Sequence, residues 1–125
     1  KVRELRTLLG CLHVGQLSPK QDVSDVGAID EALLPAFETA FLQQRRLHFT
    51  YQDAKGARSD REVEPQAMLI LPPLWYLVGW DASRADFRHF RMDRISAPMV
   101  IDGAAFRRRR VPFEADVCPF TKVVR

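Results

Sequence analysis

The spacing of apolar residues changes along the chain, and this change predicts a helical part followed by a β part. In residues 1–14 the apolar side chains recur every three or four positions, as on one face of a helix. They are Val2, Leu5, Leu9 and Leu12, with Leu8 beside them. Residues 15–30 are rich in Gly, Ser, Pro and Asp and have no sustained period, so a linker is expected there.

A second helix is predicted over residues 29–45. Its apolar face would carry Leu33, Phe37, Ala40 and Phe41. Asp30 is one candidate to cap its start, and Pro35 in the first turn is the alternative. Arg45 and Arg46 would place positive charge near the negative end of the helix dipole.

From Leu47 the period becomes two, which predicts a half-buried strand through Phe49 and Tyr51. Further strands are predicted over residues 58–71, 74–81, the stretch from Phe87, and 96–101. Pro65 has no N–H group, so the second strand should bend, bulge or lie at an edge there. Five short antiparallel strands in so few residues favour a small closed barrel, since closure removes exposed edges. The expected fold is therefore mainly β, with one or two helices before the barrel.

Residues 74–81 form an almost continuous apolar run, and a short polar connection joins them to the arginine-bearing strand. Together they predict a hairpin at the centre of the domain. Trp75 and Leu77 share one parity and are expected in the core. Tyr76 has the other parity, and its hydroxyl needs a partner when buried.

Arginine dominates the basic residues: the 19 Lys and Arg comprise mostly Arg, and the formal net charge is +3. Arginine favours two-pronged contacts with phosphate or carboxylate. A genome-wide preference for Arg over Lys is the alternative explanation. The clustering of arginines after residue 84 goes beyond composition and favours an anionic partner.

The sequence also argues against several classes of function. Cys11 and Cys118 lie far apart and have no neighbours at metal-ligand spacing, so no metal site or cofactor is expected and free thiols in a reducing cytoplasm are favoured. No nucleophile motif or phosphate loop occurs, so catalysis is not expected. No stretch is long enough to span a membrane. Because the chain begins with Lys1, it is expected to be part of a larger protein.

A series of residues between positions 45 and 106 resembles the WYL-domain family, named for a Trp-Tyr-Leu triplet. The series runs in the family's order and approximate spacing: Arg45-Arg46, Tyr51, Arg61-x-Val63-x-Pro65, Trp75-Tyr76-Leu77, Asp81, Arg88-x-Phe90-Arg91-x-Asp93-Arg94-Ile95 and Phe106. The resemblance covers residues 31–113. Residues 1–30 would then be an N-terminal helix and linker, and residues 114–125 a C-terminal extension.

The resemblance implies an Sm-like or SH3-like barrel that acts as the ligand-sensing domain of a bacterial transcription regulator. Family members usually follow a DNA-binding helix-turn-helix, often dimerise, and are associated with single-stranded DNA, RNA or nucleotide-like ligands. No helix-turn-helix is recognisable in this chain. A cytoplasmic homodimer is the expected form.

The ligand-binding residues implied by the motif are Arg61, Arg88, Arg91 and Arg94. Tyr51 and Tyr76 are expected to add hydroxyl groups to the site, and His89 and His48 switchable donors. In a regular strand Arg88 and Arg91 project to opposite faces. Arg91, with His89, is the preferred ligand contact, whereas Arg88 has the alternative of pairing with Asp81 or Asp86.

Two other side-chain groups leave structural alternatives open. Arg94 either reaches the ligand surface or pairs with Asp93 or another acid. The run Arg107–Arg110 is either a solvated segment or a nucleic-acid contact, and the two Pro-Phe pairs near the C-terminus favour an extended segment. A dimerisation or protein-interaction module, and an accessory RNA-binding module, are the competing functions.

Overall fold

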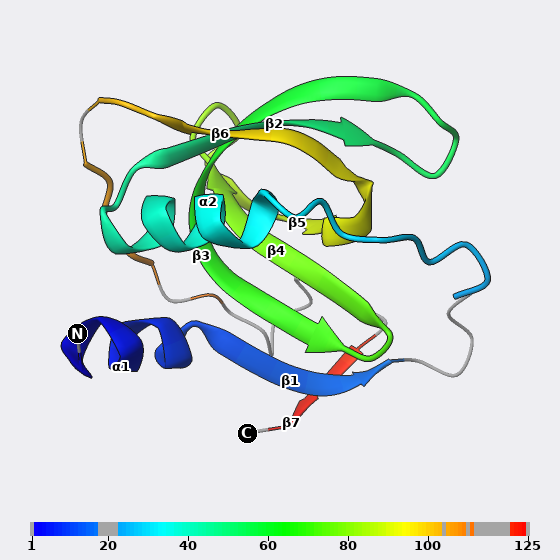
Figure 1. Cartoon of the computed structure of the whole chain (residues 1–125), viewed down its shortest axis with the longest axis horizontal. Coiled ribbons are helices and arrows are strands. Elements are labelled where there is room, and N and C mark those ends of the chain that lie inside the picture. The colour runs from blue at the N-terminus through cyan, green and yellow to red at the C-terminus, as the bar shows by residue number, and fades with distance from the viewer. Residues whose placement is uncertain (1, 18–22, 104, 110, 112–120, 125) are drawn as a thin grey trace.

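The computed structural model describes residues 2–17, 23–103, 105–109, 111 and 121–124. The elements in chain order are α1 (Val2–Gly10), β1 (Leu12–Leu17), α2 (Leu33–Leu42), β2 (Arg46–Gln52), β3 (Arg58–Leu71), β4 (Leu74–Asp81), β5 (Asp86–Arg91), the 3₁₀ turn η1 (Met92–Arg94), β6 (Ile95–Ile101) and β7 (Thr121–Val124). Figure 1 shows α2 lying across the strands, with α1 and β1 below it.

Strand β3 is the longest element and belongs to two parts of the sheet. Its first half pairs with β2, from Arg58 to Val63, and its second half pairs with β4, from Glu64 to Leu71. The register shifts between Pro65 and Ala67. The expected irregularity at Pro65 is thus confirmed, since proline cannot donate to a ladder and the strand bends where a bond is missing.

The five central strands follow the order β5-β4-β3-β2-β6. In the part of the chain that the structure describes, no ladder joins β5 to β6, so the sheet is open. The chain leaves β5 through η1 and enters β6, which pairs with β2 instead. The mainly β fold with preceding helices is confirmed. The finer Sm-like or SH3-like barrel stays a prediction.

The prediction of one helix over residues 1–14 is wrong at its end. The helix stops at Gly10, and β1 begins at Leu12, inside the predicted helix. Gly10 weakens the helix, and the Met68 amide donates to the Cys11 carbonyl at 2.9 Å, which starts a parallel ladder with β3. Part of the expected linker is therefore strand, and β7 pairs with β1 on its other side.

Helix α2 is shorter than predicted at both ends, and its buried face forms the main core. It begins at Leu33, after Ala32 and without a side-chain cap, so that Pro35 lies in its first turn and the second of the two alternatives for its start is the one observed. Asp30 accepts from the Ala32 amide at 2.9 Å in the turn before the helix. The helix ends where Gln44 adopts a left-handed conformation with φ of 54°. Its buried residues, Leu33, Phe37, Ala40 and Phe41, are the four predicted.

The hairpin of β4 and β5 separates two clusters of buried side chains. Leu77 and Phe90 are ladder partners in the main core, whereas Tyr76 and Val78 belong to a second cluster on the other side. Leu77 is in the core as predicted, but the prediction for Trp75 is wrong, because Trp75 is 37% exposed. It lies one residue from the start of β4, next to the turn that joins β3 to β4.

Candidate functional site

Arg91 is held inside the protein by carboxylates. Its Nε and Nη2 donate to Asp93 at 3.0 and 2.6 Å, and its Nη1 donates to Asp25 at 3.2 Å. Only 6% of the Arg91 side chain and 8% of the Asp93 side chain are exposed. The bonds to Asp93 outweigh the cost of burial and raise the pKa of Arg91 further above its ordinary value. This geometry gives the preferred ligand residue a structural role.

Arg94 meets the segment that precedes α2. Its Nη2 donates to Asp25 at 2.7 Å, and the Gly27 amide donates to Asp93 at 2.9 Å. The hydrogen bonds from Arg94 and then Arg91 hold the pKa of Asp25 below its usual range. Arg94 therefore pairs with Asp25, which is the alternative of a pair with an acid other than Asp93.

Tyr51 and Arg61 meet at the ring of Phe90. The Tyr51 hydroxyl accepts from the Arg91 amide at 3.2 Å, and its ring stands edge-on to Phe90 at 5.0 Å. The Arg61 guanidinium lies over the same Phe90 ring at 5.7 Å, and its Nε donates to the Ser59 hydroxyl at 3.0 Å. The structure therefore brings four predicted residues, Tyr51, Arg61, Arg91 and Arg94, into one neighbourhood.

Arg88 continues the same face of β5, two residues before Phe90. Among the residues that the structure describes, no ion pair joins Arg88 to Asp81 or Asp86. The Asp81 carboxylate instead accepts from the Ser83 hydroxyl at 2.6 Å. Arg88 is half-buried and, like Arg61, makes no ion pair with any carboxylate of the described chain.

His89 and Tyr76 project from the opposite face of the hairpin. Tyr76 is 3% exposed, and its ring stands edge-on to His89 at 5.5 Å. Burial, and then the nearby charge of Arg88, lower the pKa of His89. Tyr76 belongs to the second cluster with His89 beside it, and Tyr76 is the ladder partner of Arg91.

A cleft of about 510 Å³ lies between the β2–β3 pair and the turn from β4 to β5. Its lining includes Arg61, Trp80 and Glu64. Two ion pairs lie at its rim: Arg46 with Glu62 at 3.2 Å, and Arg84 with Asp81 at 3.9 Å. All four of these side chains also line the cleft. It is the strongest candidate site because it combines Arg61 with an aromatic wall.

Sequence reasoning missed Trp80 and Glu64 as part of this cleft. Trp80 lies near the end of the apolar run that predicts a core strand, so the pattern gave it no separate role. Glu64 carried a visible signal, because an acid between Val63 and Pro65 interrupts the buried part of a strand. Glu64 is 5% exposed.

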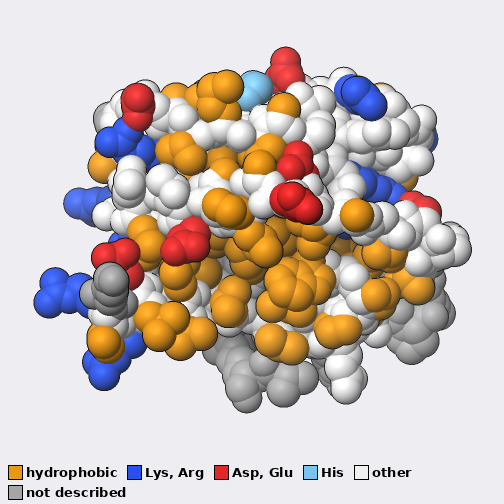
Figure 2. Space-filling model, in the orientation of Figure 1, with side chains coloured by type: hydrophobic (Ala, Val, Ile, Leu, Met, Phe, Trp, Pro, Cys, Tyr) orange, Lys and Arg blue, Asp and Glu red, His pale blue; other side chains and the backbone are white. Residues whose placement is uncertain are grey.

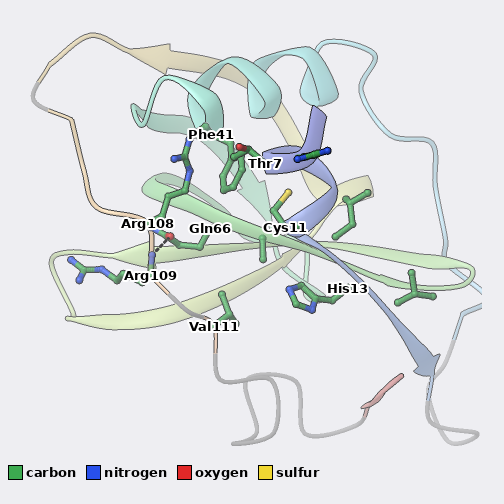
Figure 3. Close-up of a pocket in the computed structure, with 13 residues that line it drawn as sticks. Thr7, Cys11, His13, Phe41, Gln66, Arg108, Arg109 and Val111 are labelled. Atoms are coloured by element: carbon green, nitrogen blue, oxygen red, sulfur yellow. Dashed lines mark hydrogen bonds between the residues drawn. The ribbon is translucent and has the colours of Figure 1, made fainter. Parts of the chain in front are cut away.

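A separate hollow of about 740 Å³ lies between α1, β1 and the C-terminal segment (Figure 3). None of the predicted ligand residues lines it. Cys11 lies in its wall, where burial raises the pKa of the thiol to about 11. Arg108 donates to the Phe41 carbonyl at 2.8 Å and lies over the Phe41 ring at 4.8 Å. Of the arginine run, Arg108 thus stabilises the end of α2, and Arg110 lies outside the described residues.

The described residues contain no group of three His, Cys, Asp or Glu side chains placed to hold a metal ion. No helix in the described part of the chain is long and apolar enough to cross a membrane. The Pro-Phe pairs 112–113 and 119–120 lie outside the described residues. In Figure 2 hydrophobic side chains gather across the middle of the face with α1 and α2, while most basic side chains lie toward its margin.

The family model for the WYL domain matches residues 32–100, more than half of the chain. The chain therefore belongs to the WYL-domain family. The family resemblance inferred from the motif is confirmed.

Two similar proteins place the domain in a wider context. The chain is 29% identical over 76 residues to the uncharacterized HTH-type transcriptional regulator YobV of Bacillus subtilis, a match that spans 61% of this chain and 23% of that protein. It is also similar to the structure of the proteasome accessory factor B/C (PafBC) of Arthrobacter aurescens, with a TM-score of 0.54 and 25% identity. That match covers 71% of this chain and 13% of PafBC. The chain thus spans less than a quarter of either protein.

Proposed function

We propose that this chain is the ligand-sensing domain of a bacterial transcription regulator, and that its cleft binds an anionic ligand derived from nucleic acid. The observation that carries the proposal is the state of Arg61. Arg61 lines the cleft, and its half-buried guanidinium lies over Phe90 and makes no ion pair with a described carboxylate. An arginine in this state is ready for a charge-assisted, two-pronged bond to phosphate.

The rim of the cleft supports the same ligand class. Arg46 and Arg84 each pair with an acid at the surface, at 3.2 and 3.9 Å. Surface ion pairs of this kind contribute about 0–1 kcal/mol, so exchanging a carboxylate for a phosphate costs little. The cleft volume of about 510 Å³ lies in the range of small-ligand sites. A nucleotide, or a few nucleotides of single-stranded DNA or RNA, fits this combination.

Arg91 has a different part in this proposal. It fixes the end of β5 by joining Asp93 and Asp25, and its backbone amide orients the Tyr51 hydroxyl. Arg88 then extends along the same face of β5 as Phe90. The ligand contact proposed in the cleft is Arg61. Arg88, which does not line the cleft, is proposed as a second contact on the face of β5 that carries Phe90, and Arg91 holds the strand that presents it.

Regulation would follow if the ligand binds one arrangement of the full regulator more tightly than another. The name of YobV, an HTH-type transcriptional regulator, supports a role beside a DNA-binding domain. Tyr51, Asp25 and Arg94 connect the ligand side of the sheet to the segment before α2. That segment is the proposed route from the cleft to the N-terminal part of the chain.

The test is a fluorescence-anisotropy titration with labelled short single-stranded DNA and RNA, with unlabelled nucleotides as competitors. Arg61→Ala and Arg88→Ala should each weaken binding about tenfold to a hundredfold, as expected for the loss of one charged hydrogen-bond donor. Arg58→Ala is the matched control, since it removes the same charge from the exposed start of β3. No saturable binding, or an equal loss with Arg58→Ala, would contradict the proposal.

A second candidate function rests on α1. Its apolar residues Val2, Leu5 and Leu9 are 67%, 57% and 58% exposed, and none of its residues is buried. This stripe is the surface proposed for pairing with a second copy of the chain. Sedimentation should detect a dimer that the double variant Leu5→Lys, Leu9→Lys converts to monomer. A wild-type monomer at high concentration would exclude this function.

A further inference from the structure

Glu64 is a buried acid with an unused hydrogen-bonding atom. Its side chain is 7% exposed, and its Oε1 has no hydrogen-bond partner among the described residues. Glu64 forms a long ion pair with Arg109. The Arg109 Nη2 lies 3.8 Å from the Glu64 Oε1, which is too far for a hydrogen bond. A buried carboxylate oxygen without a donor is costly, so its presence in a cleft indicates that a donor arrives from outside.

Trp80 provides a flat apolar wall beside this carboxylate. Its ring is covered on one side by the Arg109 guanidinium at 4.2 Å, and it meets Phe87 edge-on at 5.0 Å. The Arg109 guanidinium, a planar group rich in N–H donors, therefore occupies the space over the Trp80 indole and next to Glu64. A nucleobase is also planar, also stacks on aromatic rings, and also carries N–H donors at its edge.

Arg109 can leave this place without unfolding the segment that carries it. Its backbone amide donates to the Gln66 side-chain oxygen at 2.6 Å, as the dashed line in Figure 3 shows. The neighbouring Arg107 carbonyl accepts from the Gln66 amide group at 3.4 Å. The Arg109 side chain is 39% exposed, and among the described residues its contacts are the stacking on Trp80 and the long ion pair with Glu64.

Glu64 and Trp80 share a cleft with Arg61 but lie on the other face of β3. Glu64, Trp80 and Arg61 line the same cleft. Arg61 and Glu64 are three residues apart on β3, so their side chains project to opposite faces of the strand, with Arg61 over Phe90 and Glu64 beside its ladder partner Trp80. A nucleotide whose base stacks on Trp80 would therefore reach Arg61 only across the cleft that both residues line.

We propose that Trp80 and Glu64 form a guanine-binding subsite that the Arg109 side chain covers when no ligand is bound. Ionised carboxylates only accept hydrogen bonds. The Watson–Crick edge of guanine presents two adjacent donors, N1–H and the N2 amine. Adenine and cytosine place a ring-nitrogen acceptor beside their single amine, which would face the carboxylate unfavourably. This inference rests on the proposed function and specifies the base that the cleft selects.

The affinities of different nucleotides can be compared by tryptophan fluorescence, provided that the protein keeps a single tryptophan in the subsite. In a Trp75→Phe background, Trp80 is the single fluorescent tryptophan, and its quenching reports stacking in the subsite. GMP should bind about tenfold more tightly than AMP, with IMP, which lacks the N2 amine, in between. A thymine oligonucleotide with one central guanine, compared with one central adenine, tests whether the base is read in a strand or only as a free nucleotide.

Variants separate the subsite from the phosphate contact. Glu64→Gln should remove the preference for GMP while leaving AMP affinity unchanged, and Arg109→Ala should tighten GMP binding severalfold because the competing guanidinium is gone. Arg107→Ala is the control on the same segment and should change neither. Equal affinity for GMP and AMP in the wild-type chain would overturn the subsite. If that binding still depended on Arg61, the proposed function would stand, whereas no nucleotide binding at all would overturn both.

Discussion

Arg91→Ala is the substitution that best separates a structural arginine from a ligand-binding one. The change removes two hydrogen bonds to Asp93, at 3.0 and 2.6 Å, and leaves a carboxylate whose side chain is only 8% exposed. Breaking a buried ion pair typically costs about 3–5 kcal/mol. Asp93 would keep the bond from the Gly27 amide, so a cost of about 2–3 kcal/mol is expected.

Urea unfolding followed by circular dichroism measures this cost. With a slope of about 2 kcal/mol per molar urea, the midpoint should fall by about 1–1.5 M at pH 7. Arg94→Ala is the control, because Arg94 pairs with the half-exposed Asp25, and its midpoint should move by less than about 0.5 M. Adding Asp93→Ala to Arg91→Ala should recover part of the stability, since no buried charge then remains unpaired.

The effect should also depend on pH in a defined direction. Burial raises the pKa of Asp93, but the bonds from Arg91 and from the Gly27 amide outweigh it and hold the pKa below its usual range. A carboxyl group with a lowered pKa in the folded state stabilises the fold above its unfolded pKa of about 3.9. The difference between wild type and Arg91→Ala should therefore be full at pH 7 and shrink as the pH falls below about 4. A variant as stable as wild type that no longer binds ligand would refute the structural role of Arg91.

Two further predictions concern packing. Gly79→Ala should destabilise the fold by about 1–3 kcal/mol, because an added Cβ would lie 2.7 Å from the Cγ2 of Val63 and 2.8 Å from the Cβ of Val63. Gly103→Ala is the control, because a Cβ added there would have no atom within 4 Å. Equal urea midpoints for the two variants would contradict the close packing at Gly79. In a Cys118→Ser background, Cys11 should react with iodoacetamide far more slowly in the folded chain than in urea, because the pKa of its thiol is raised to about 11. Mass spectrometry measures the two rates, and equal rates would show that the thiol is accessible in the folded chain.

Local pattern was sufficient to predict the central strands. The limits of β3 match the apolar and proline pattern of residues 58–71, and its irregularity at Pro65 follows from the missing N–H group. The apolar face of α2 was likewise predictable from its spacing. Strand β1 was not, because Leu12 continued a helical stripe and its ladder partner Met68 lies far along the chain. Pairing over such a separation overrides local propensity.

The candidate site was predicted less well than the fold, and the reason is again distance along the chain. Parity distinguished the two faces of β5 but could not show that Arg91 is buried. The partner that lies nearby in sequence, Asp93, was visible, whereas Asp25 lies 66 residues before Arg91. Arg109 and Trp80 are also remote in sequence, so their stacking had no local signal.

The most direct test of the central claim is the salt dependence of single-stranded DNA binding. An arginine that neutralises one phosphate of a single strand contributes about 0.7 to the slope of log K against log salt. Arg61→Ala is predicted to lower the slope by about this amount, and Arg58→Ala is predicted to leave it unchanged. Equal slopes for wild type and Arg61→Ala would show that Arg61 does not meet a phosphate, and would contradict the assignment of the cleft as the ligand site.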